Sequence, residues 1–386
     1  MESIKLIEIE DEWEVLQSFM PHGWLEEAKK KGALVRSRKF AGGDVLLRIL
    51  LIHLADGCSL RETTTRAREG GIADISDVAL LKRLKASGEW LRWIAVNLMQ
   101  NWIEKLPALI FGNTRAVRVI DGSNVQEPGS TGSSWRIHYS VGIPSLRCDE
   151  VYVTEPKRGE SFCNFKVHEG DIFLGDRGYA HRRGIDHVIQ GGGDVLVRIN
   201  LTNVPLVDPV GGAFLLLDNL RTLEKTRLGD WDVCIPYEGR QIRGRVCALK
   251  KDRKSAEKAR QNALKENSRK GQRVRPETLE SAEYVFVFTT LDRSFSPVAV
   301  LEMYRGRWQI ELVFKRLKSL INIGHLKKID SDSAKAWIHG KLMVAFLIEA
   351  MIRAGENVFP WGYPVLEDSP PLPMPLEGNF VHASFA

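Results

Sequence analysis

The hydrophobic pattern of the chain changes its period near residue 115, and this change constrains the fold more than any other feature. Before it, apolar residues recur at helical spacing and few strand signals are present. After it come short apolar or alternating runs separated by turns, at 115–125, 135–142, 149–155, 171–179 and 193–199. A helical pattern lies between the last two runs, and further strands are expected at 213–217, 231–237 and 242–250. This order predicts a mixed α/β fold preceded by an all-α N-terminal region.

The N-terminal region, residues 1–110, contains two predicted basic helices. Ser59 and Glu62 have capping-box spacing, so a helix is expected to begin there, and a second helix over 76–87 follows the break at Gly70–Gly71. The spacing resembles a helix-turn-helix, whose arginine and lysine side chains can meet DNA phosphates. Two basic amphipathic helices joined by glycine are also common in plain helical bundles, so both interpretations stay open.

The composition favours a folded protein with a polyanionic partner. The chain has 386 residues, 44% of them hydrophobic and 27% charged, which excludes wholesale disorder, a collagen and a coiled coil. Lys and Arg number 55 against 49 Asp and Glu. Residues 250–275 hold 11 basic and 3 acidic side chains, a local excess larger than that of the whole chain. This run predicts either a solvated helix or a contact with a nucleic-acid backbone.

Targeting and cysteine patterns predict a cytoplasmic protein. The five cysteines form no C-x-x-C pair, so neither a zinc site nor a disulfide framework is indicated. The acidic start lacks the basic-then-apolar order of a signal peptide. The most apolar run, 45–55, is far shorter than the ~20 residues that cross a bilayer. We therefore expect no membrane partner.

Two aspartates follow predicted strands. Asp121 comes directly after an apolar run and before a glycine, and Asp176 has the same setting. A strand end fixes the position of a side chain while the following turn leaves it accessible, so α/β sheets often assemble sites there. For either residue alone, an Asx-turn or a helix cap is the simpler explanation.

A third acidic residue lies in a polar stripe on a predicted helix. Tyr304, Arg307, Glu311 and Lys318 stand at i, i+3, i+7 and i+14, which places them within an arc of roughly 60° on one helix face. By itself this could be a surface stripe with an ordinary ion pair, and three carboxylates alone could also suit a phosphatase or a metal-dependent sugar enzyme. Cations on both sides of Glu311 favour a metal-binding carboxylate beside a phosphodiester.

With these residues in place, the sequence resembles the DDE transposases of bacterial insertion sequences, specifically the insertion-sequence-four group. The stripe matches that group's Y-x2-R-x3-E-x6-K signature without a gap. The segment DGSNVQEPGSTGSSWRIHYS is similar to the group's first Asp block, and Asp176 to Tyr179 match its D-x-G-Y motif. The resemblance covers roughly residues 59–362.

The resemblance implies a ribonuclease H-like catalytic core with two Mg²⁺ ions, for which Mn²⁺ would substitute. Its metal ligands and catalytic residues would be Asp121, Asp176 and Glu311. Its phosphate contacts would come from Tyr304, Arg307 and Lys318. Two such ions can activate a water or a 3′-hydroxyl on one side of a phosphate and stabilise the leaving oxygen on the other.

The resemblance also suggests a division of the chain. We expect a helical DNA-binding region at 1–110, the first part of the core at 111–205, a mainly β insertion with the basic helix at 206–280, the second part of the core at 281–359 and a Pro-rich disordered tail at 360–386.

The function implied is cut-and-paste transposition. Such an enzyme would bind double-stranded DNA at the terminal inverted repeats, cleave it, and join the freed ends to target DNA as a homodimer at the bacterial nucleoid. The alternative is a decayed or domesticated copy that binds DNA without completing transposition. The tail favours this alternative, because a helical and often basic segment commonly follows the P-W-G-Y region in the family. A metallohydrolase that does not act on DNA requires the stripe to be coincidental.

Overall fold

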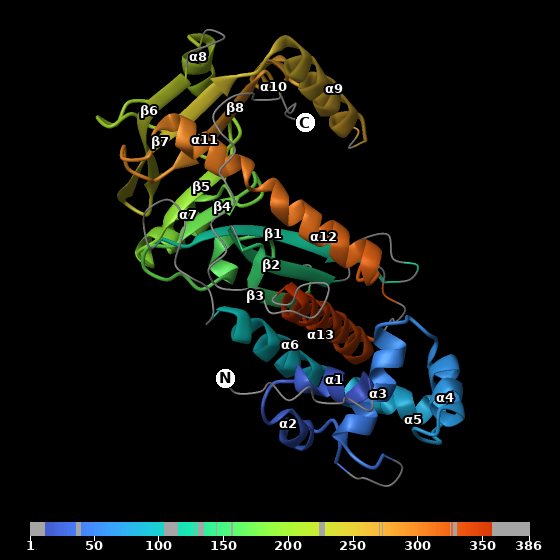
Figure 1. Cartoon of the computed structure of the whole chain (residues 1–386). Coiled ribbons are helices and arrows are strands. Elements are labelled where there is room, and N and C mark those ends of the chain that lie inside the picture. Colours follow the sequence, from blue (N-terminus) through green and yellow to red (C-terminus); the bar gives the residue numbers. More distant parts are fainter. Residues whose placement is uncertain are drawn as a thin grey trace.

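The computed structural model describes residues 12–356, apart from 36–39, 104–114, 128, 130–134, 144, 156, 224–227, 270, 272, 325 and 327–329. The N-terminal part of these residues is helical, as predicted (Figure 1). Its helices are α1 (Glu12–Ser18), α2 (Trp24–Lys30), α3 (Gly43–Leu54), α4 (Leu60–Glu69), α5 (Asp77–Ala86) and α6 (Gly88–Ile103).

The predicted helix starts of α4 and α5 are confirmed. The Ser59 side chain accepts a hydrogen bond from the Glu62 backbone N–H at 3.1 Å, and Ser76 caps α5 in the same way. These caps satisfy backbone donors that the first helical turn leaves free. Gly71, between the two helices, has a φ of 66°, a left-handed conformation that glycine adopts without strain.

One sheet of eight strands runs through the rest of the described chain. Its strands are β1 (Val117–Val125), β2 (Trp135–Ile143), β3 (Arg147–Thr154), β4 (Ile172–Gly175), β5 (Asp194–Arg198), β6 (Leu228–Tyr237), β7 (Arg240–Lys250) and β8 (Tyr284–Thr289). The spatial order is β3-β2-β1-β4-β5-β8-β7-β6. The β1–β4 and β4–β5 pairs are parallel and the other pairs are antiparallel. The predicted mixed α/β class is thus confirmed.

Alternation along the strands builds two cores, one on each side of the sheet. Val119 and Leu174 belong to a core that includes α11 (Pro297–Arg305), α12 (Trp308–Leu320) and α13 (Ser331–Glu356). Their neighbours Ile120 and Phe173 belong to the opposite core, with the short η1 (Phe162–Asn164) and α7 (Arg182–Gln190). Successive side chains of a strand point to opposite faces, so both faces must be covered by helices.

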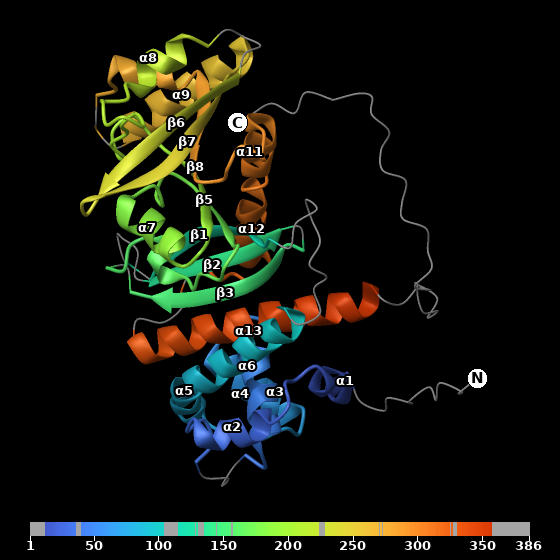
Figure 2. The ribbon, with the colours of Figure 1, turned by 90° about the vertical axis from the view of Figure 1, so that its left-hand side faces the viewer.

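Helix α13 joins the sheet to the N-terminal helices. It lies between the β1–β3 part of the sheet and α6, and it also contacts α3 and α5 (Figure 2). At the crossing with α3, a Cβ on Gly340 would lie 2.5 Å from a side-chain carbon of Leu54, so only glycine permits this approach. The His339 ring is within hydrogen-bond distance of the Gly88 carbonyl, 3.1 Å away, at the start of α6.

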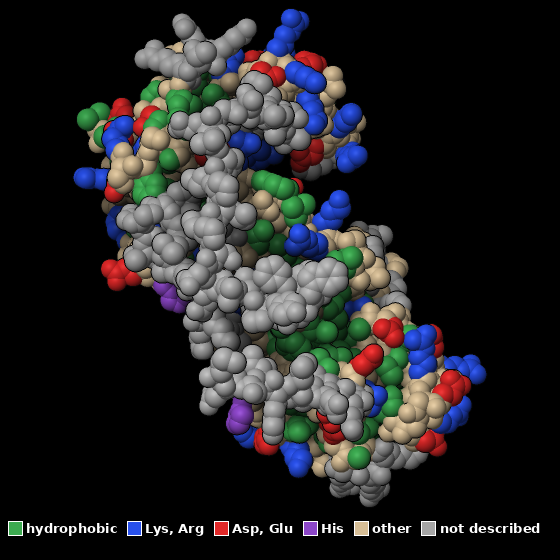
Figure 3. Space-filling view, in the orientation of Figure 1, with side chains coloured by type: hydrophobic (Ala, Val, Ile, Leu, Met, Phe, Trp, Pro, Cys, Tyr) green, Lys and Arg blue, Asp and Glu red, His purple; other side chains and the backbone are tan. Residues whose placement is uncertain are grey.

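The segment predicted as a β insertion extends the same sheet. Strands β6 and β7 form a hairpin whose second strand pairs with β8, and α8 (Leu216–Arg221), α9 (Arg253–Arg269) and α10 (Pro276–Ser281) lie beside it. The expected strand at 213–217 is wrong. Leu216 and Leu220 are buried on one side of α8, four residues apart, which is helical rather than strand spacing. The basic run forms α9, and Figure 3 shows Lys and Arg side chains gathered over it.

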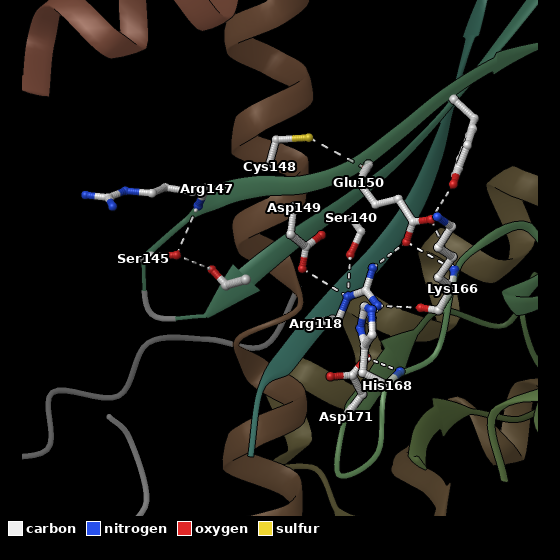
Figure 4. Close-up of polar contacts among 12 residues, drawn as sticks. Arg118, Ser140, Ser145, Arg147, Cys148, Asp149, Glu150, Lys166, His168 and Asp171 are labelled. Carbon is white, nitrogen blue, oxygen red and sulfur yellow. Dashed lines mark hydrogen bonds and ion pairs between the residues drawn. The ribbon is translucent and has the colours of Figure 1, made fainter. Parts of the chain in front are cut away.

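A buried ion cluster fixes the first half of β1. Arg118 is 4% exposed, and its guanidinium donates to Asp149 at 3.0 Å, Asp171 at 3.0 Å and Glu150 at 2.6 Å (Figure 4). It also donates to the Lys166 carbonyl at 2.6 Å. The cluster connects β1 to β3 and to the loop before β4, so it holds the sheet in register where the aspartate-bearing half of β1 begins.

Among the described residues, no helix is both long and apolar enough to cross a membrane. The Pro-rich segment 360–386, predicted to be disordered, lies outside the described residues.

Candidate active site

Asp121 lies within β1, not at its end as the sequence suggested. The strand continues to Val125 because β2 pairs with it along its whole length, with Asp121 opposite Tyr139. Pairing with the parallel neighbour β4 ends earlier, at Val119 and Leu174. Asp121 therefore stands just beyond the last residue of β1 paired with β4. Its Oδ1 atom accepts a hydrogen bond from the Gly122 N–H at 2.7 Å.

Asp176 directly follows the last residue of β4, as predicted. Like Asp121, it lies two residues beyond the Val119–Leu174 pair, so the parallel register brings the two carboxylates to the same edge. Its Oδ1 atom accepts from the Gly178 N–H at 2.7 Å. The turn requires Gly175, because a Cβ there would lie 2.7 Å from the Phe162 ring.

Glu311 lies in the first turn of α12. The sequence predicted one continuous helix carrying the polar stripe, and this prediction is wrong. The helix is divided into α11 and α12 at Gly306 and Arg307. Gly306 packs so closely on β2 that a Cβ would lie 3.1 Å from Ile143, and glycine is also a weak helix former. Tyr304 is therefore on α11, while Glu311 and Lys318 are on α12.

Arg307 connects Glu311 to the aspartates. One guanidinium nitrogen, Nη2, bonds to the Glu311 carboxylate, and the other, Nη1, lies 3.8 Å from Oδ2 of Asp121. Glu311 is 60% exposed, whereas Arg307 and Asp121 are each 19% exposed. Among the described residues, no group of three or more His, Cys, Asp or Glu side chains is arranged to hold a metal ion. Arg307 keeps Glu311 apart from the aspartates.

Negative charge at the aspartates lacks a close counter-ion. Burial raises the pKa of Asp121 from 3.8 to about 7, and the charges of Asp176 and Glu160 add to this, against the lowering effects of the Gly122 N–H and Arg307. Burial, with the charge of Asp176, also raises the pKa of Glu160. Oxygen ligands of this kind are those that a hard divalent cation prefers, so a cation would stabilise the site.

The fully buried Tyr179 hydroxyl adds a second unsatisfied group. It has no hydrogen-bond partner among the described residues. Burial raises the pKa of Tyr179, and the charges of Asp121, Glu160 and Asp176 raise it further. A buried hydroxyl without a partner costs about 1–3 kcal/mol, so a bound ligand or water at this point would be favoured.

Of the predicted phosphate-contacting residues, two lie together and one lies further away. Tyr304 is half-buried, and it and Arg307 perturb one another electrostatically. Lys318 is exposed, seven residues beyond Glu311, which is roughly 10 Å along a helix. It packs beside Gly324, within 3.4 Å of where a Cβ would stand.

A basic cluster beside the site was missed by the sequence analysis. Burial lowers the pKa of Arg198, on β5, and the charges of Arg177 and Arg307 lower it further. Burial likewise lowers the pKa of Lys251 to about 8, with contributions from Arg198 and Arg177. Like charges held together out of water favour an anion between them. Their positions in the sequence, at 177, 198 and 251, share no spacing that could have revealed the cluster.

The W-R-x-H block, which the resemblance singled out without a role, contributes packing and hydrogen bonds. The Trp135 indole donates to Glu127 at 3.1 Å. His138 is buried and its Nε2 lies 2.8 Å from the Thr154 hydroxyl. Burial lowers the pKa of His138 to about 4. Arg136 lies 3.9 Å from Glu160 and so borders the carboxylate site.

Comparisons with known proteins agree on one family. The family described as "Transposase DDE domain" matches residues 163–347, which include Asp176 and Glu311. A putative transposase, InsL, of insertion sequence element IS186A from Escherichia coli (strain K12) is 32% identical, covering 89% of this chain and 94% of its own length. The transposase of element IS421 from Escherichia coli has the same identity and coverage. The transposase of element IS231B from Bacillus thuringiensis subsp. berliner is 22% identical over 84% of this chain and 76% of its own.

Proposed function

This chain belongs to the DDE transposases of bacterial insertion sequences, and on that premise we propose that Asp121, Asp176 and Glu311 are its catalytic carboxylates. The observation that carries the proposal is the parallel register of β1 and β4, which brings two aspartates 55 residues apart to one sheet edge. Arg307 then joins Glu311 to that edge. The three residues come from separate elements of a packed scaffold, which is how a precise site is held.

DDE transposases use divalent metal ions. We propose that two Mg²⁺ ions, or Mn²⁺ in their place, are held here by Asp121, Asp176 and Glu311. The crowding of buried carboxylates and the unpartnered Tyr179 hydroxyl support this fit. When bound, the ions would supply activation of a water or 3′-hydroxyl and stabilisation of the leaving oxygen.

The chain's own cations position the DNA. Tyr304, Arg307 and Lys318 would contact phosphates of the transposon end, and the half-buried Arg198 and Lys251 would hold a further phosphate. Positive charge that is desolvated in the free protein gains most from an anionic partner. A phosphate that accepts from Arg307 competes with Glu311 for the same guanidinium, so DNA binding would free the Glu311 carboxylate.

The strand order β3-β2-β1-β4-β5 supports a ribonuclease H-like core, because a three-stranded antiparallel unit is followed by two parallel strands. The division at 111–205, 206–280 and 281–359 remains our proposal for how this core is interrupted. We also propose that α4 and α5 contact DNA, that the enzyme acts as a homodimer on two transposon ends, and that it works at the nucleoid.

Cleavage of the element's own ends tests the catalytic assignment. The substrate is a plasmid that carries the gene of this chain with its flanking DNA, so that both inverted repeats are present. Asp121→Ala, Asp176→Ala and Glu311→Ala should each reduce Mg²⁺-dependent cleavage about ten-thousand-fold, because a group that acts in the transition state is lost. End binding, measured by gel shift, should persist.

The matched control is Glu302→Ala, which removes an exposed carboxylate paired with Arg305 on the same helical segment. Its cleavage rate should equal that of the wild type. Wild-type-like cleavage by any of the three active-site variants would refute the assignment. Recovery of the element in a second plasmid separates complete transposition from the alternative, a protein that binds DNA without completing the reaction.

A further inference from the structure

Four basic side chains of α9 lie on one face of that helix. They stand at i, i+4, i+11 and i+15, which places them within an arc of roughly 60°. All four are exposed, whereas Ala256, on the opposite side of the helix, is buried. These residues, which we call the α9 row, are Lys254, Lys258, Lys265 and Arg269.

The α9 row lacks counter-ions within the part of the chain that the structure describes. No member forms an ion pair or a hydrogen bond with another described residue. The two acidic residues of α9, Glu257 and Glu266, stand outside the row. Glu257 lies 3.7 Å from Arg260 on the other side of the helix, and Arg260 also bonds to Glu283. The positive charge of the row is therefore available to a partner outside the chain.

The length of the α9 row indicates the kind of partner. Its ends are 15 residues apart, or roughly 22 Å along the helix. A small anion reaches only part of such a row, whereas duplex DNA carries a charge about every 1.7 Å and follows all of it. Like charges four residues apart, such as Lys254 and Lys258, also destabilise a free helix, and a polyanion relieves this repulsion.

The α9 row continues from the edge of the sheet that carries the aspartates. Gly175 of β4 pairs with Val197 of β5, so Asp176 and Arg198, each one residue further on, stand at the same level. Strand β8 is antiparallel to both β5 and β7, so those two strands run in the same direction. Lys251 directly follows β7 at this edge, and α9 begins two residues later. Across the sheet, the edge thus carries carboxylates, then cations, then α9.

The cations between the aspartates and α9 also point to an anionic partner. Arg198 is half-buried and forms no hydrogen bond or ion pair with another described residue. Lys251 donates to the Ala282 carbonyl at 3.0 Å, and the charge of Arg198 acts on it. In Figure 3, the Lys and Arg side chains over α9 lie on the same face of the molecule as α12, and the surface is hollowed between the two helices. A polynucleotide at the aspartates would therefore find cations along its way to α9.

We propose that the α9 row binds the phosphate backbone of the duplex that continues from the catalytic edge. One transposon end would then be held at the aspartates, at Arg198 and Lys251, and along α9. The inference rests on the proposed function, since it takes the DNA at the edge to be the transposon end. It adds a helix that contacts the backbone without reading the base sequence.

The salt dependence of binding tests this inference, with the full chain and a labelled duplex that contains the element's own end. Lys258→Gln combined with Lys265→Gln should keep the helix, because glutamine is a good helix former and both positions are exposed. The slope of log K against log salt should fall by about 0.9 for each lost contact, and so by about 1.8. The Kd at about 0.1 M salt should rise about tenfold.

Two control variants separate charge at the row from other effects. Lys258→Arg combined with Lys265→Arg keeps the charge and should keep the wild-type slope. Lys29→Gln combined with Arg243→Gln removes two exposed charges elsewhere, on α2 and near the start of β7, at the far end of that strand from Lys251. It should also keep the slope. An unchanged slope in the Lys258 and Lys265 glutamine variant would show a merely solvated helix and overturn the inference, as would an equal fall in the second control.

Crosslinking identifies which DNA lies on α9. Gln261→Cys, an exposed position beside the row, is labelled with a photoreactive azide, and the unsubstituted chain is the control for its own five cysteines. In reactions that contain both DNAs, crosslinks are expected at a fixed position of the end duplex. Crosslinks to target DNA alone would overturn the assignment to the transposon end.

The outcomes are distinct from those of the proposed function, because binding is measured rather than cleavage. If the glutamine variant of Lys258 and Lys265 keeps the wild-type slope while Asp121→Ala loses cleavage, the α9 row is excluded and the proposed catalytic site stands. If the slope falls while Asp121→Ala cleaves like the wild type, the catalytic assignment fails and α9 remains a DNA-binding surface.

Discussion

Two charged clusters on β1 have their central residues, Arg118 and Asp121, only three positions apart. They differ in how closely their carboxylates are paired with a cation. At Arg118, the guanidinium contacts three carboxylates at 2.6–3.0 Å, and each of its nitrogens donates to a partner. At Asp121, the nearest guanidinium nitrogen stands 3.8 Å away, and the same guanidinium bonds instead to Glu311. The guanidinium of the first cluster is thus paired at every nitrogen, whereas the Asp121 carboxylate of the second has no cation at hydrogen-bond distance.

The difference teaches which polar groups of this fold serve stability and which serve chemistry. A buried cation with all its hydrogen bonds made holds strands together and has no capacity left for a ligand. Buried carboxylates with distant counter-ions destabilise the free protein, and a cation or DNA phosphates would relieve this cost. Along β1, the Arg118 cluster comes before Asp121. The half of the strand that carries Asp121 therefore follows directly on a part that ion pairs hold in place.

The comparison predicts its largest effect on folding at Arg118. Arg118→Met leaves Asp149, Glu150 and Asp171 without their shared cation, so the free energy of unfolding should fall by about 3–5 kcal/mol. Urea unfolding followed by circular dichroism measures this loss. Arg293→Met is the control and should cost less than about 1 kcal/mol. Arg293 is 58% exposed, its partner Asp232 is also exposed, and its other partner Asp230 keeps an ion pair with Arg245. Equal losses of unfolding free energy in the two variants would show that the Arg118 cluster stabilises the fold no more than the Arg293 ion pairs do.

A smaller effect is expected from Asp121 when pH is varied in metal-free buffer. The folded carboxyl has a pKa of about 7 against 3.8, so it binds its proton more tightly in the folded state than in the unfolded state. Its contribution to stability is complete below about pH 4 and is lost as pH rises to about 7. Relative to Asp121→Asn, the wild type should lose up to about 4 kcal/mol across that window, since each pKa unit corresponds to about 1.4 kcal/mol. A pH-independent difference between the two proteins would contradict the unbalanced charge at Asp121.

The smallest effect concerns the salt dependence of DNA binding. Arg307 is available to a phosphate in a way that Arg118 is not, so Arg307→Ala should lower the slope of log K against log salt by about 0.9. Lys318→Ala should do the same. Arg305→Ala, next to Gly306 and paired with Glu302, is the control and should leave the slope unchanged. Unchanged slopes in Arg307→Ala and Lys318→Ala would show that these two residues do not contact phosphates.

The sequence predicted the elements better than their connections. Short apolar or alternating runs identified β1 to β5, and the Ser59 cap with the break at Gly70–Gly71 located α4 and α5. The strand expected at 213–217 failed because its apolar residues also fit a short helix. The division of the stripe at Gly306 coincides with close packing against Ile143, a tertiary contact, although the glycine itself was a local signal of a weak helix.

The candidate site shows the same limit. The motif spacing indicated Asp121, Asp176 and Glu311, since each stands in a recognisable local pattern. Glu160 had no such pattern, because its position depends on two glycines that are distant in sequence and on a histidine in α7. The Arg198 and Lys251 cluster likewise arises only when the sheet places β5 and the end of β7 on the two sides of β8.

The packing of α13 on α6 also has a consequence for biosynthesis. The partner that α6 needs is nearly 250 residues further along the chain, so the N-terminal helices leave the ribosome long before their apolar surface can be covered. A product that ends early, before residue 331, would keep that surface open and be a substrate for proteases and aggregation. Only a polypeptide translated through α13 can cover this surface of α6 with its own chain.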